Sequence, residues 1–351
     1  MQKSLGMFVP RSRRSSITKE ERNRTGPAYS GSPAKGRITV PLDPTVQEYV
    51  TRIQALHAPA LRTLTPEQAR EGFVASQKLL QAAAPMTPNI LTEDLMIPGP
   101  YGEIPVRVYA SAHQEAVPLV LFFHGGGFVL GDIESYDHVA RALQAASSAV
   151  VISVGYHRPP EFKFPKPVDE CFAALHWVMR HATDWNTDPH CLFVSGDSAG
   201  GNLAAVVAQK ARHDGITLRG QILFYPTTDM LAVTASKQIF GTQYLLQNDD
   251  MAWFGEMYLR TVEDALLPEA SPARLPNLAG LSPTFIATAE YDPLRDEAED
   301  YAHALQAQGV DVWLRRYEGV IHGFVSVPFF AQASAVMRDA ARFIQQHCAP
   351  S

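Results

Sequence analysis

From residue 90 onward, short apolar runs alternate with amphipathic segments, and this alternation limits the folds open to the chain. The runs 119–123 and 150–152 contain no polar residue, as expected of parallel strands that helices cover on both faces. Strands separated by helices predict a doubly wound, mainly parallel α/β sheet. We expect strands at 94–97, 104–109, 119–123, 150–154, 192–195, 221–225, 284–289 and 312–317, and helices at about 136–146, 168–182, 199–213, 297–308 and 330–346. The alternating pattern of 104–109 suggests an antiparallel or edge strand.

Two regions do not fit this alternation. Apolar residues recur at helical spacing over 46–56, and Thr65 and Gln68 have capping-box spacing at the start of a second helix, which runs to about Ala83. About 60 residues then separate the strand ending at Tyr225 from the one starting at Thr284, too many for a plain crossover. We therefore expect cap helices in 41–90, the first part of an α/β core in 91–228, a cap insertion in 229–275 and the second part of the core in 276–351.

The first 40 residues differ in composition from the rest. They carry nine basic and two acidic residues with many Ser, Gly and Pro, which predicts a disordered tail. They lack the apolar segment of a secretory signal, and no apolar run in the chain is long enough for a transmembrane helix. The formal net charge of the whole chain is −6, so the part after the basic tail is acidic. Nucleic acid is therefore not an expected partner.

The chain has three cysteines, Cys171, Cys191 and Cys348, far apart and without a Cys-x-x-Cys motif. So sparse and odd a number argues against a disulfide framework and for a reducing compartment. We accordingly expect a cytoplasmic location.

Residues 196–200 read Gly-Asp-Ser-Ala-Gly and lie between a predicted strand and a predicted helix. A serine in such a nucleophile elbow sits on a turn so tight that its neighbours must be small. The alternative is an ordinary strand-to-helix turn in which Ser198 caps the helix. The strand–turn–helix context favours a nucleophile.

Residues 124–127 read His-Gly-Gly-Gly and follow another predicted strand. Consecutive glycines leave backbone N–H groups unshielded, and such donors can hold the oxyanion of a tetrahedral intermediate. A dinucleotide-binding fingerprint fails because position 130 is Leu, and the Gly-Lys-Ser/Thr ending of a P-loop is absent. A flexible turn would not explain the pairing of this motif with a downstream elbow.

A serine nucleophile needs a base, and the base needs a carboxylate to orient it. In this architecture the chain order is serine, acid, histidine. Asp292 and His322 have this order, and each follows a predicted strand, where open α/β sheets build their sites. Asp296 and Glu290 lie close to Asp292 in sequence and remain alternatives for the acid.

These motifs resemble the bacterial hormone-sensitive-lipase family of esterases. The resemblance is carried by residues 124–128 (His-Gly-Gly-Gly-Phe), 196–202 (Gly-Asp-Ser-Ala-Gly-Gly-Asn), 292–294 (Asp-Pro-Leu) and 322–324 (His-Gly-Phe), and it covers roughly 41–348. The Gly-Asp-Ser-Ala-Gly form is similar to one of the family's two main subgroups. Residues 156–165 resemble the family's Tyr-Arg-Leu-Ala-Pro-Glu-His-Pro-Phe-Pro segment, but Arg158-Pro159 replaces Leu-Ala.

The resemblance implies an α/β-hydrolase fold with a helical cap and a Ser198–His322–Asp292 triad that needs no metal or cofactor. It also implies oxyanion donors at the N–H groups of Gly126, Gly127 and Ala199, with His124 and Gly125 supporting the loop. The expected function is a serine carboxylesterase for small esters, with short to medium acyl chains because the cap encloses the site. The family often forms homodimers through the last strand, here 312–317.

Two other functions are open at this point. An amide or carbamate hydrolase would use the same triad, and nothing in the sequence separates the two reactions. A small-molecule-binding protein on this scaffold is the second alternative. The plant gibberellin receptors resemble the family but lack the catalytic histidine, whereas His322 is present here.

Overall fold

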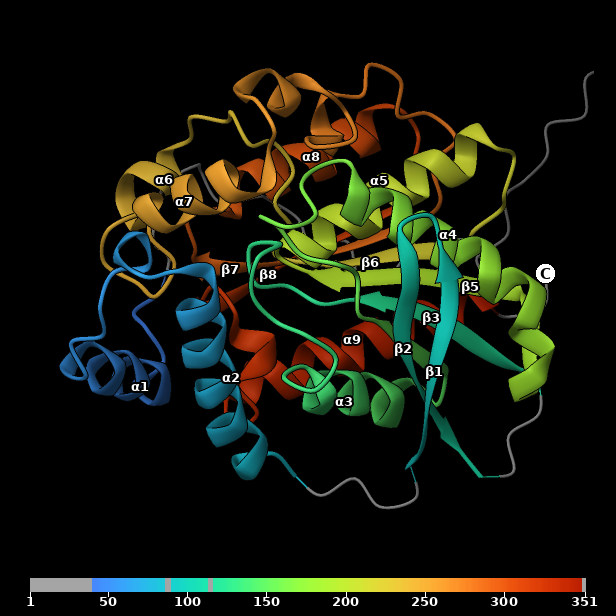
Figure 1. Ribbon diagram of the computed structural model, residues 1–351, viewed down its shortest axis with the longest axis horizontal. Helices are drawn as coiled ribbons and strands as arrows, with labels where there is room; N and C mark the ends of the chain where they lie inside the picture. Colours follow the sequence, from blue (N-terminus) through green and yellow to red (C-terminus); the bar gives the residue numbers. More distant parts are fainter. Residues whose placement is uncertain (1–39, 86–89, 113–115, 349–351) are drawn as a thin grey trace, which may run out of the picture. The chain divides into compact units, whose positions relative to one another are not determined.

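Eight strands form one sheet at the centre of the computed structural model, which describes residues 40–85, 90–112 and 116–348 (Figure 1). The strand order is β1-β2-β4-β3-β5-β6-β7-β8. β2 is antiparallel to both β1 and β4, as its alternating pattern suggested, and the other neighbours are parallel. The bounds are β1 (Ile90–Gly99), β2 (Gly102–Ser111), β3 (Val117–Phe123), β4 (Val150–Val154), β5 (Thr187–Asp197), β6 (Gly220–Phe224), β7 (Thr284–Tyr291) and β8 (Val312–Ile321). Every predicted strand is confirmed.

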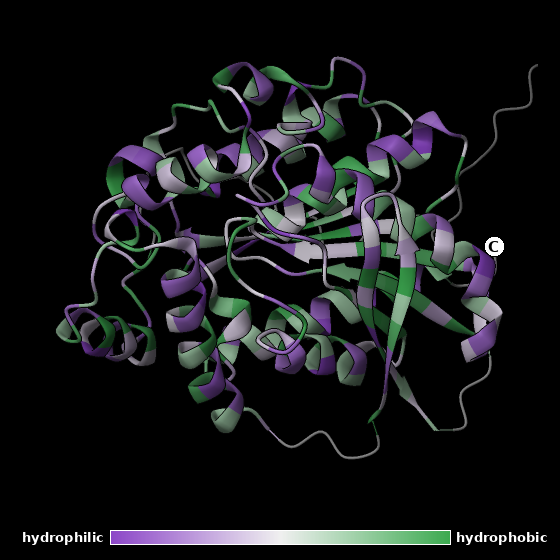
Figure 2. Cartoon of the chain, viewed as in Figure 1, coloured by the Kyte–Doolittle hydropathy of each residue, from purple (hydrophilic) through white to green (hydrophobic). Residues whose placement is uncertain are grey.

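Helices cover both faces of the sheet, which explains the unbroken apolar runs. Leu121 and Phe123 of β3 belong to the core on one face, and Val120 and Phe122 belong to the core on the other. One core includes α4 (Lys166–His181), α5 (Ala199–His213) and α8 (Arg295–Ala307), and the other includes α3 (Asp137–Ser147) and α9 (Ala331–Cys348). In Figure 2 the helices show alternating purple and green bands, as expected of helices with one buried side.

The N-terminal helices contact the insertion between β6 and β7. These helices are α1 (Pro44–Ala55) and α2 (Pro66–Ala83), and the insertion holds α6 (Ala235–Phe240) and α7 (Asn248–Tyr258). Ala69 of α2, Trp253 of α7, and Val129 and Leu130 after β3 form a third, smaller apolar cluster. The capping box of α2 is confirmed, because Gln68 N donates to Thr65 Oγ1 at 3.2 Å and Thr65 N donates to Gln68 Oε1 at 3.0 Å. In the described part of the chain, no helix is long and apolar enough to cross a membrane.

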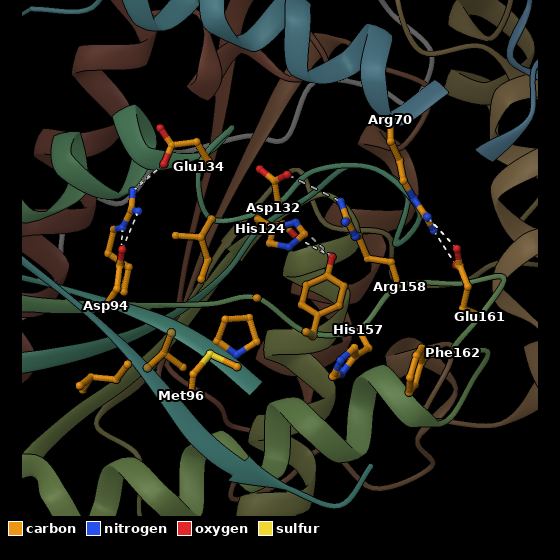
Figure 3. Close-up of a pocket in the computed structure, with 17 residues that line it drawn as sticks. Arg70, Asp94, Met96, His124, Asp132, Glu134, His157, Arg158, Glu161 and Phe162 are labelled. Carbon is orange, nitrogen blue, oxygen red and sulfur yellow. Dashed lines mark hydrogen bonds and ion pairs between the residues drawn. The ribbon is translucent and has the colours of Figure 1, made fainter. Parts of the chain in front are cut away.

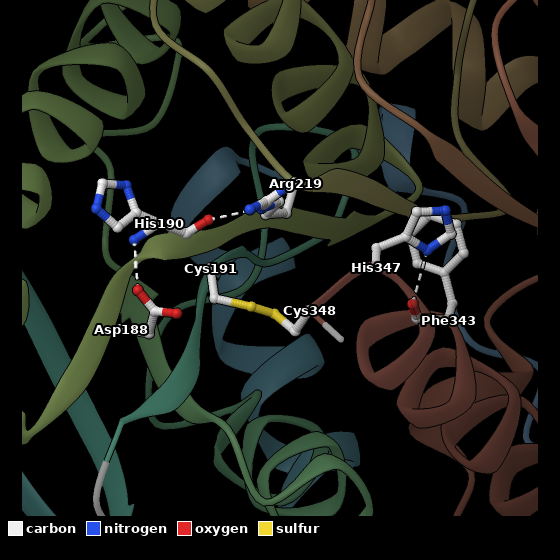
Figure 4. The surroundings of a disulfide bond; sticks show 7 residues. All are labelled: Asp188, His190, Cys191, Arg219, Phe343, His347 and Cys348. Atoms are coloured by element: carbon white, nitrogen blue, oxygen red, sulfur yellow. Dashed lines mark hydrogen bonds between the residues drawn. A yellow bond between two sulfur atoms is a disulfide. The ribbon is translucent and has the colours of Figure 1, made fainter. Parts of the chain in front are cut away.

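The sparse and odd number of cysteines argued against disulfides, and this expectation is wrong. Cys191, in β5, and Cys348, the last residue of α9, form a disulfide across 157 residues of sequence, with their Cα atoms 5.7 Å apart (Figure 4). The pairing arises because α9 packs back on the sheet and its end meets β5. A sparse count says nothing about such proximity in space. Cys171 is buried and free. The predicted tail, residues 1–40, lies outside the described residues except for Val40.

Candidate active site

Four strands end directly before the residues singled out in the sequence. His124, Ser198, Asp292 and His322 are the first residues after β3, β5, β7 and β8. These strands are parallel, so their carboxyl ends meet at one edge of the sheet. The chain thus delivers the four side chains to a common region from positions up to about 200 residues apart.

Ser198 has the backbone geometry of a nucleophile elbow. Its φ of 54° and ψ of −116° lie in a region that a serine rarely occupies. The turn is held because Ser198 N donates to Phe224 O of β6 at 2.8 Å, while the next residue begins α5. Ser198 therefore lies on a tight strand-to-helix turn, and the N-cap alternative fails because Ser198 makes no side-chain cap hydrogen bond to α5.

The structure brings Ser198, His322 and Asp292 into one hydrogen-bonded chain. Ser198 Oγ lies 2.9 Å from His322 Nε2, and His322 Nδ1 lies 2.7 Å from Asp292 Oδ2. Because a carboxylate only accepts, Nδ1 carries the proton and Nε2 is free to accept from the serine hydroxyl. Asp292 is fully buried, and its other oxygen accepts from Leu294 N at 2.7 Å. The carboxylate therefore fixes both the tautomer and the orientation of the imidazole.

The neighbouring carboxylates have other partners. Asp296 accepts from Ser236 N, in α6, and from Arg295 Nε, each at 2.9 Å. Glu290 accepts from Gly319 N at 3.0 Å. Of the three carboxylates considered in the sequence, Asp292 is thus the one bonded to His322.

The predicted oxyanion loop leaves its donors unused. Among the described residues, the N–H groups of Gly126 and Gly127 donate no hydrogen bond, and Ala199 is the first residue of α5, where N–H groups lack intrahelical acceptors. Gly127 has a φ of +59°, and a Cβ there would overlap the ring of Phe254 from α7. Phe254 therefore lies directly against the loop. His124 itself is buried, donates from Nδ1 to Gly125 O at 2.9 Å, and has a pKa lowered to about 4 by burial.

Comparisons with known proteins agree with this geometry. A family model described as alpha/beta hydrolase fold matches residues 120–326, more than half of the chain. The chain belongs to the α/β-hydrolase family. Its relatives place this α/β-hydrolase in the hormone-sensitive-lipase group of esterases that the motifs resemble.

Three relatives illustrate the likeness. Carboxylic ester hydrolase LipN of Mycobacterium tuberculosis is 39% identical, over 82% of this chain and 77% of LipN. An arylesterase of Saccharolobus solfataricus is 33% identical, over 86% of this chain and 98% of that protein. The solved structure of a hyperthermophilic esterase from Pyrobaculum calidifontis has a TM-score of 0.83 and 40% identity, covering 87% of this chain and 98% of that one.

One part of the α/β-hydrolase site was not anticipated from the sequence. Asp197, beside Ser198, is buried and binds the predicted oxyanion loop: Gly125 N donates to its Oδ1 at 2.8 Å, and the hydroxyl of Tyr136 donates to its Oδ2 at 3.2 Å. The carboxylate thus joins the elbow to the loop. Asp197 could have been noticed in the sequence because it lies in the Gly-Asp-Ser-Ala-Gly pentapeptide. No motif around Tyr136 indicates a role for it. Within the described residues, no group of three or more His, Cys, Asp or Glu is arranged to hold a metal ion.

We predict that Asp197 makes the stability of the enzyme depend on pH. Burial raises its pKa to about 7. The folded pKa lies above the unfolded value, so the contribution of Asp197 is complete below pH 4 and is lost as pH rises through 7. Asp197→Asn keeps an acceptor but cannot ionise. Relative to the wild type, it should gain stability between about pH 4 and 7, by up to about 4 kcal/mol.

Denaturant unfolding at several pH values measures this difference. The exposed Asp249→Asn variant is the matched control for loss of one charge. A constant difference between wild type and Asp197→Asn across this range would contradict the prediction.

Proposed function

We propose that this α/β-hydrolase is a serine carboxylesterase in which Ser198, His322 and Asp292 form the catalytic triad. The observation that carries the proposal is the continuous hydrogen-bonded chain from Ser198 Oγ to Asp292, beside two unused loop N–H groups. Relatives named carboxylic ester hydrolase and arylesterase support the ester as substrate class. They do not favour the amide alternative, and the intact triad argues against a non-catalytic binding protein.

The geometry supports a two-step reaction. Ser198 Oγ attacks the ester carbonyl carbon as its proton passes to His322 Nε2, and Asp292 stabilises the resulting imidazolium. The N–H groups of Gly126, Gly127 and Ala199 hold the oxyanion, each contributing on the order of 3 kcal/mol to the transition state. His322 then protonates the leaving alcohol as the carbon–oxygen bond breaks. Water attacks the acyl-enzyme by the reverse sequence, releasing the acid and restoring Ser198.

We propose further that the N-terminal helices and the insertion form a cap, within 41–90 and 229–275, that restricts acyl length. Phe254 lies on the oxyanion loop, and its neighbour Trp253 belongs to the apolar cluster that joins α7 to α2. Aromatic side chains packed this close to the reacting carbon leave less room for a long chain than an open site would. Short to medium acyl groups therefore fit best.

The p-nitrophenyl esters of acetate, butyrate, octanoate and palmitate test this proposal. We expect kcat/KM to peak at butyrate or octanoate and to fall at least tenfold for palmitate, because a chain that does not fit loses transition-state binding. Matched anilides in the same assay separate ester from amide turnover. Palmitate as the best substrate would contradict the size restriction while leaving the triad intact.

Two expectations from the sequence, a homodimer and a cytoplasmic location, remain predictions. A homodimer through β8 is compatible with its position as the last strand in the sheet order, and sedimentation of the purified protein tests it. The Cys191–Cys348 disulfide is typical of oxidising compartments and argues against the expected cytoplasmic location. Fractionation of cells that express the chain would decide the location.

A further inference from the structure

A cavity of about 590 Å³ lies outside the catalytic site (Figure 3). Its walls come from the β1–β2 pair, from residues 132–134, 155–158 and 161–162, from Arg70 of α2 and from His124. None of Ser198, Asp292 and His322 lines it. The volume is within the usual range for sites that bind small molecules, so the cavity could hold a ligand without involving the triad.

Two of the three arginines in its wall are fully engaged. Arg70 forms a bidentate pair with Glu161 at 2.7 and 2.8 Å. Arg107 bonds Asp94 at 2.6 and 3.0 Å and Glu134 at 2.9 Å. These guanidinium groups already have carboxylate partners, so neither offers a ligand an unpaired charge.

Arg158 differs from both. Among the described residues its one hydrogen bond goes to the carbonyl oxygen of Gly131, and its ion pair with Asp132 is long, at 4.0 Å. In Figure 3 it lies between His124 and Arg70. Burial and the positive charge of Arg70 lower the pKa of Arg158 by more than Asp132 and Glu161 raise it, so an anion paired directly with the guanidinium would stabilise its charge. The related family segment has leucine at this position, and the triad makes no use of the guanidinium.

The rest of the wall indicates the kind of anion. Met96, Ile133 and Phe162 supply apolar surface, which suits a hydrocarbon chain. The planar fork of an arginine matches a carboxylate with two parallel hydrogen bonds. Four carboxylates also line the cavity and would repel a dianion such as a phosphate ester: Asp94, Asp132, Glu134 and Glu161.

A second feature is a ring nitrogen of His124, beside the cavity, that lacks a hydrogen-bond partner in the described structure. His124 is fully buried, and its Nε2 has no hydrogen bond to any described residue. Because Nδ1 donates to Gly125, Nε2 is an acceptor. Because the side chain is fully buried, a ligand in the cavity reaches this nitrogen only if the wall rearranges.

We propose that this cavity binds a small monocarboxylate with a short apolar chain, held by Arg158. The acid that ester hydrolysis releases is itself a small monocarboxylate. Only this connection between the ligand and the reaction product rests on the proposed function. Arg158 is bonded to Gly131, at the end of the segment that begins with His124 and carries the oxyanion donors. A carboxylate that draws the guanidinium away from Gly131 would therefore change the position of the oxyanion loop without entering the catalytic site. The product acid would in this way regulate the reaction.

Calorimetric titration of the full chain with sodium hexanoate tests the site. Arg158→Leu and Arg158→Gln should each weaken hexanoate binding at this site at least tenfold, because a charge-assisted pair is lost. Arg62→Leu is the matched control, since Arg62 is exposed and pairs with Glu256 on the surface. Hexan-1-ol, which lacks the charge, should not bind at the Arg158 site, and inorganic phosphate should bind more weakly than hexanoate.

The proposal is overturned if both Arg158 variants bind hexanoate like the wild type, or if hexanol or phosphate binds as tightly. If Arg158→Leu does not fold, Arg158→Gln and the wild-type comparison of hexanoate with hexanol still decide. Kinetics give a second test: hexanoate should inhibit the wild type with a noncompetitive component that Arg158→Gln lacks. An inactive wild type would refute the proposed function but leave the binding result standing.

Discussion

Replacement of Ser198 by alanine should lower kcat for p-nitrophenyl butyrate by about 10⁴- to 10⁶-fold with the fold unchanged. The hydroxyl oxygen lies 2.9 Å from the base that would take its proton, and no other hydroxyl is bonded to His322 in the described structure. The substitution removes the atom that forms the acyl-enzyme, so only the background catalysis of the oxyanion loop would remain. Initial rates of the purified variant measure the loss of kcat, and its circular dichroism shows whether the fold is unchanged.

Ser195→Ala is the matched control for this experiment. Ser195 lies three residues earlier on β5, and its hydroxyl is buried without a hydrogen-bond partner in the part of the chain that the structure describes. Its removal makes the same chemical change in the same strand but leaves the site intact, so activity should stay near the wild-type level. If Ser198→Ala kept more than about a hundredth of the wild-type rate, a loss far short of that expected for a nucleophile, the triad assignment would fail.

The second large effect concerns Gly200, two residues after the proposed nucleophile, Ser198. A Cβ at this position would overlap the carbonyl oxygen of Phe123 and would lie 2.6 Å from that of His124, both backbone atoms that cannot move aside alone. Gly200→Ala should therefore push α5 away from the end of β3. We expect a destabilisation on the order of 3 kcal/mol or more and a loss of activity beyond it, because Ser198 and the oxyanion loop would separate.

Gly72→Ala makes the same substitution where nothing opposes it. Gly72 is exposed within α2, and its added Cβ would meet no atom within 4 Å. Alanine is favoured over glycine in a helix interior, so this variant should be more stable by roughly 0.5–1 kcal/mol. Thermal melts and ester turnover of both variants check the pair. A Gly200→Ala protein as stable and active as the wild type would show that the elbow is not packed as described.

Much of the fold follows from local patterns. Buried parallel strands must be apolar on both sides, so the runs 119–123 and 150–152 mark β3 and β4 without reference to any partner. The end of a strand was harder to predict: β8 continues to Ile321, four residues beyond the expected end. Its pairing with β7 is long, with a register irregularity after Ala289, and that pairing sets the length.

The site could be predicted in part because chain order and strand ends are properties of the sequence. Ser198, Asp292 and His322 each follow a strand, and parallel strands end at one edge. The choice among Asp292, Asp296 and Glu290 is different in kind. The three lie within seven residues, but their side chains have different partners. Asp296 bonds α6, Glu290 bonds β8, and Asp292 bonds His322. Only packed side chains distinguish them.

The sequence alone determined the order of the elements, the strand-to-helix turn at Ser198 and the glycine loop, because each depends on residues that are neighbours in the chain. The tertiary structure decided the contacts between distant residues. These are the bond from Tyr136 to Asp197, the packing of Phe254 on Gly127, the Cys191–Cys348 disulfide and the cavity around Arg158. Hydrophobic burial is not directional, so a pattern can specify which face of an element is buried. Which side chain it then meets depends on the close packing of the whole core.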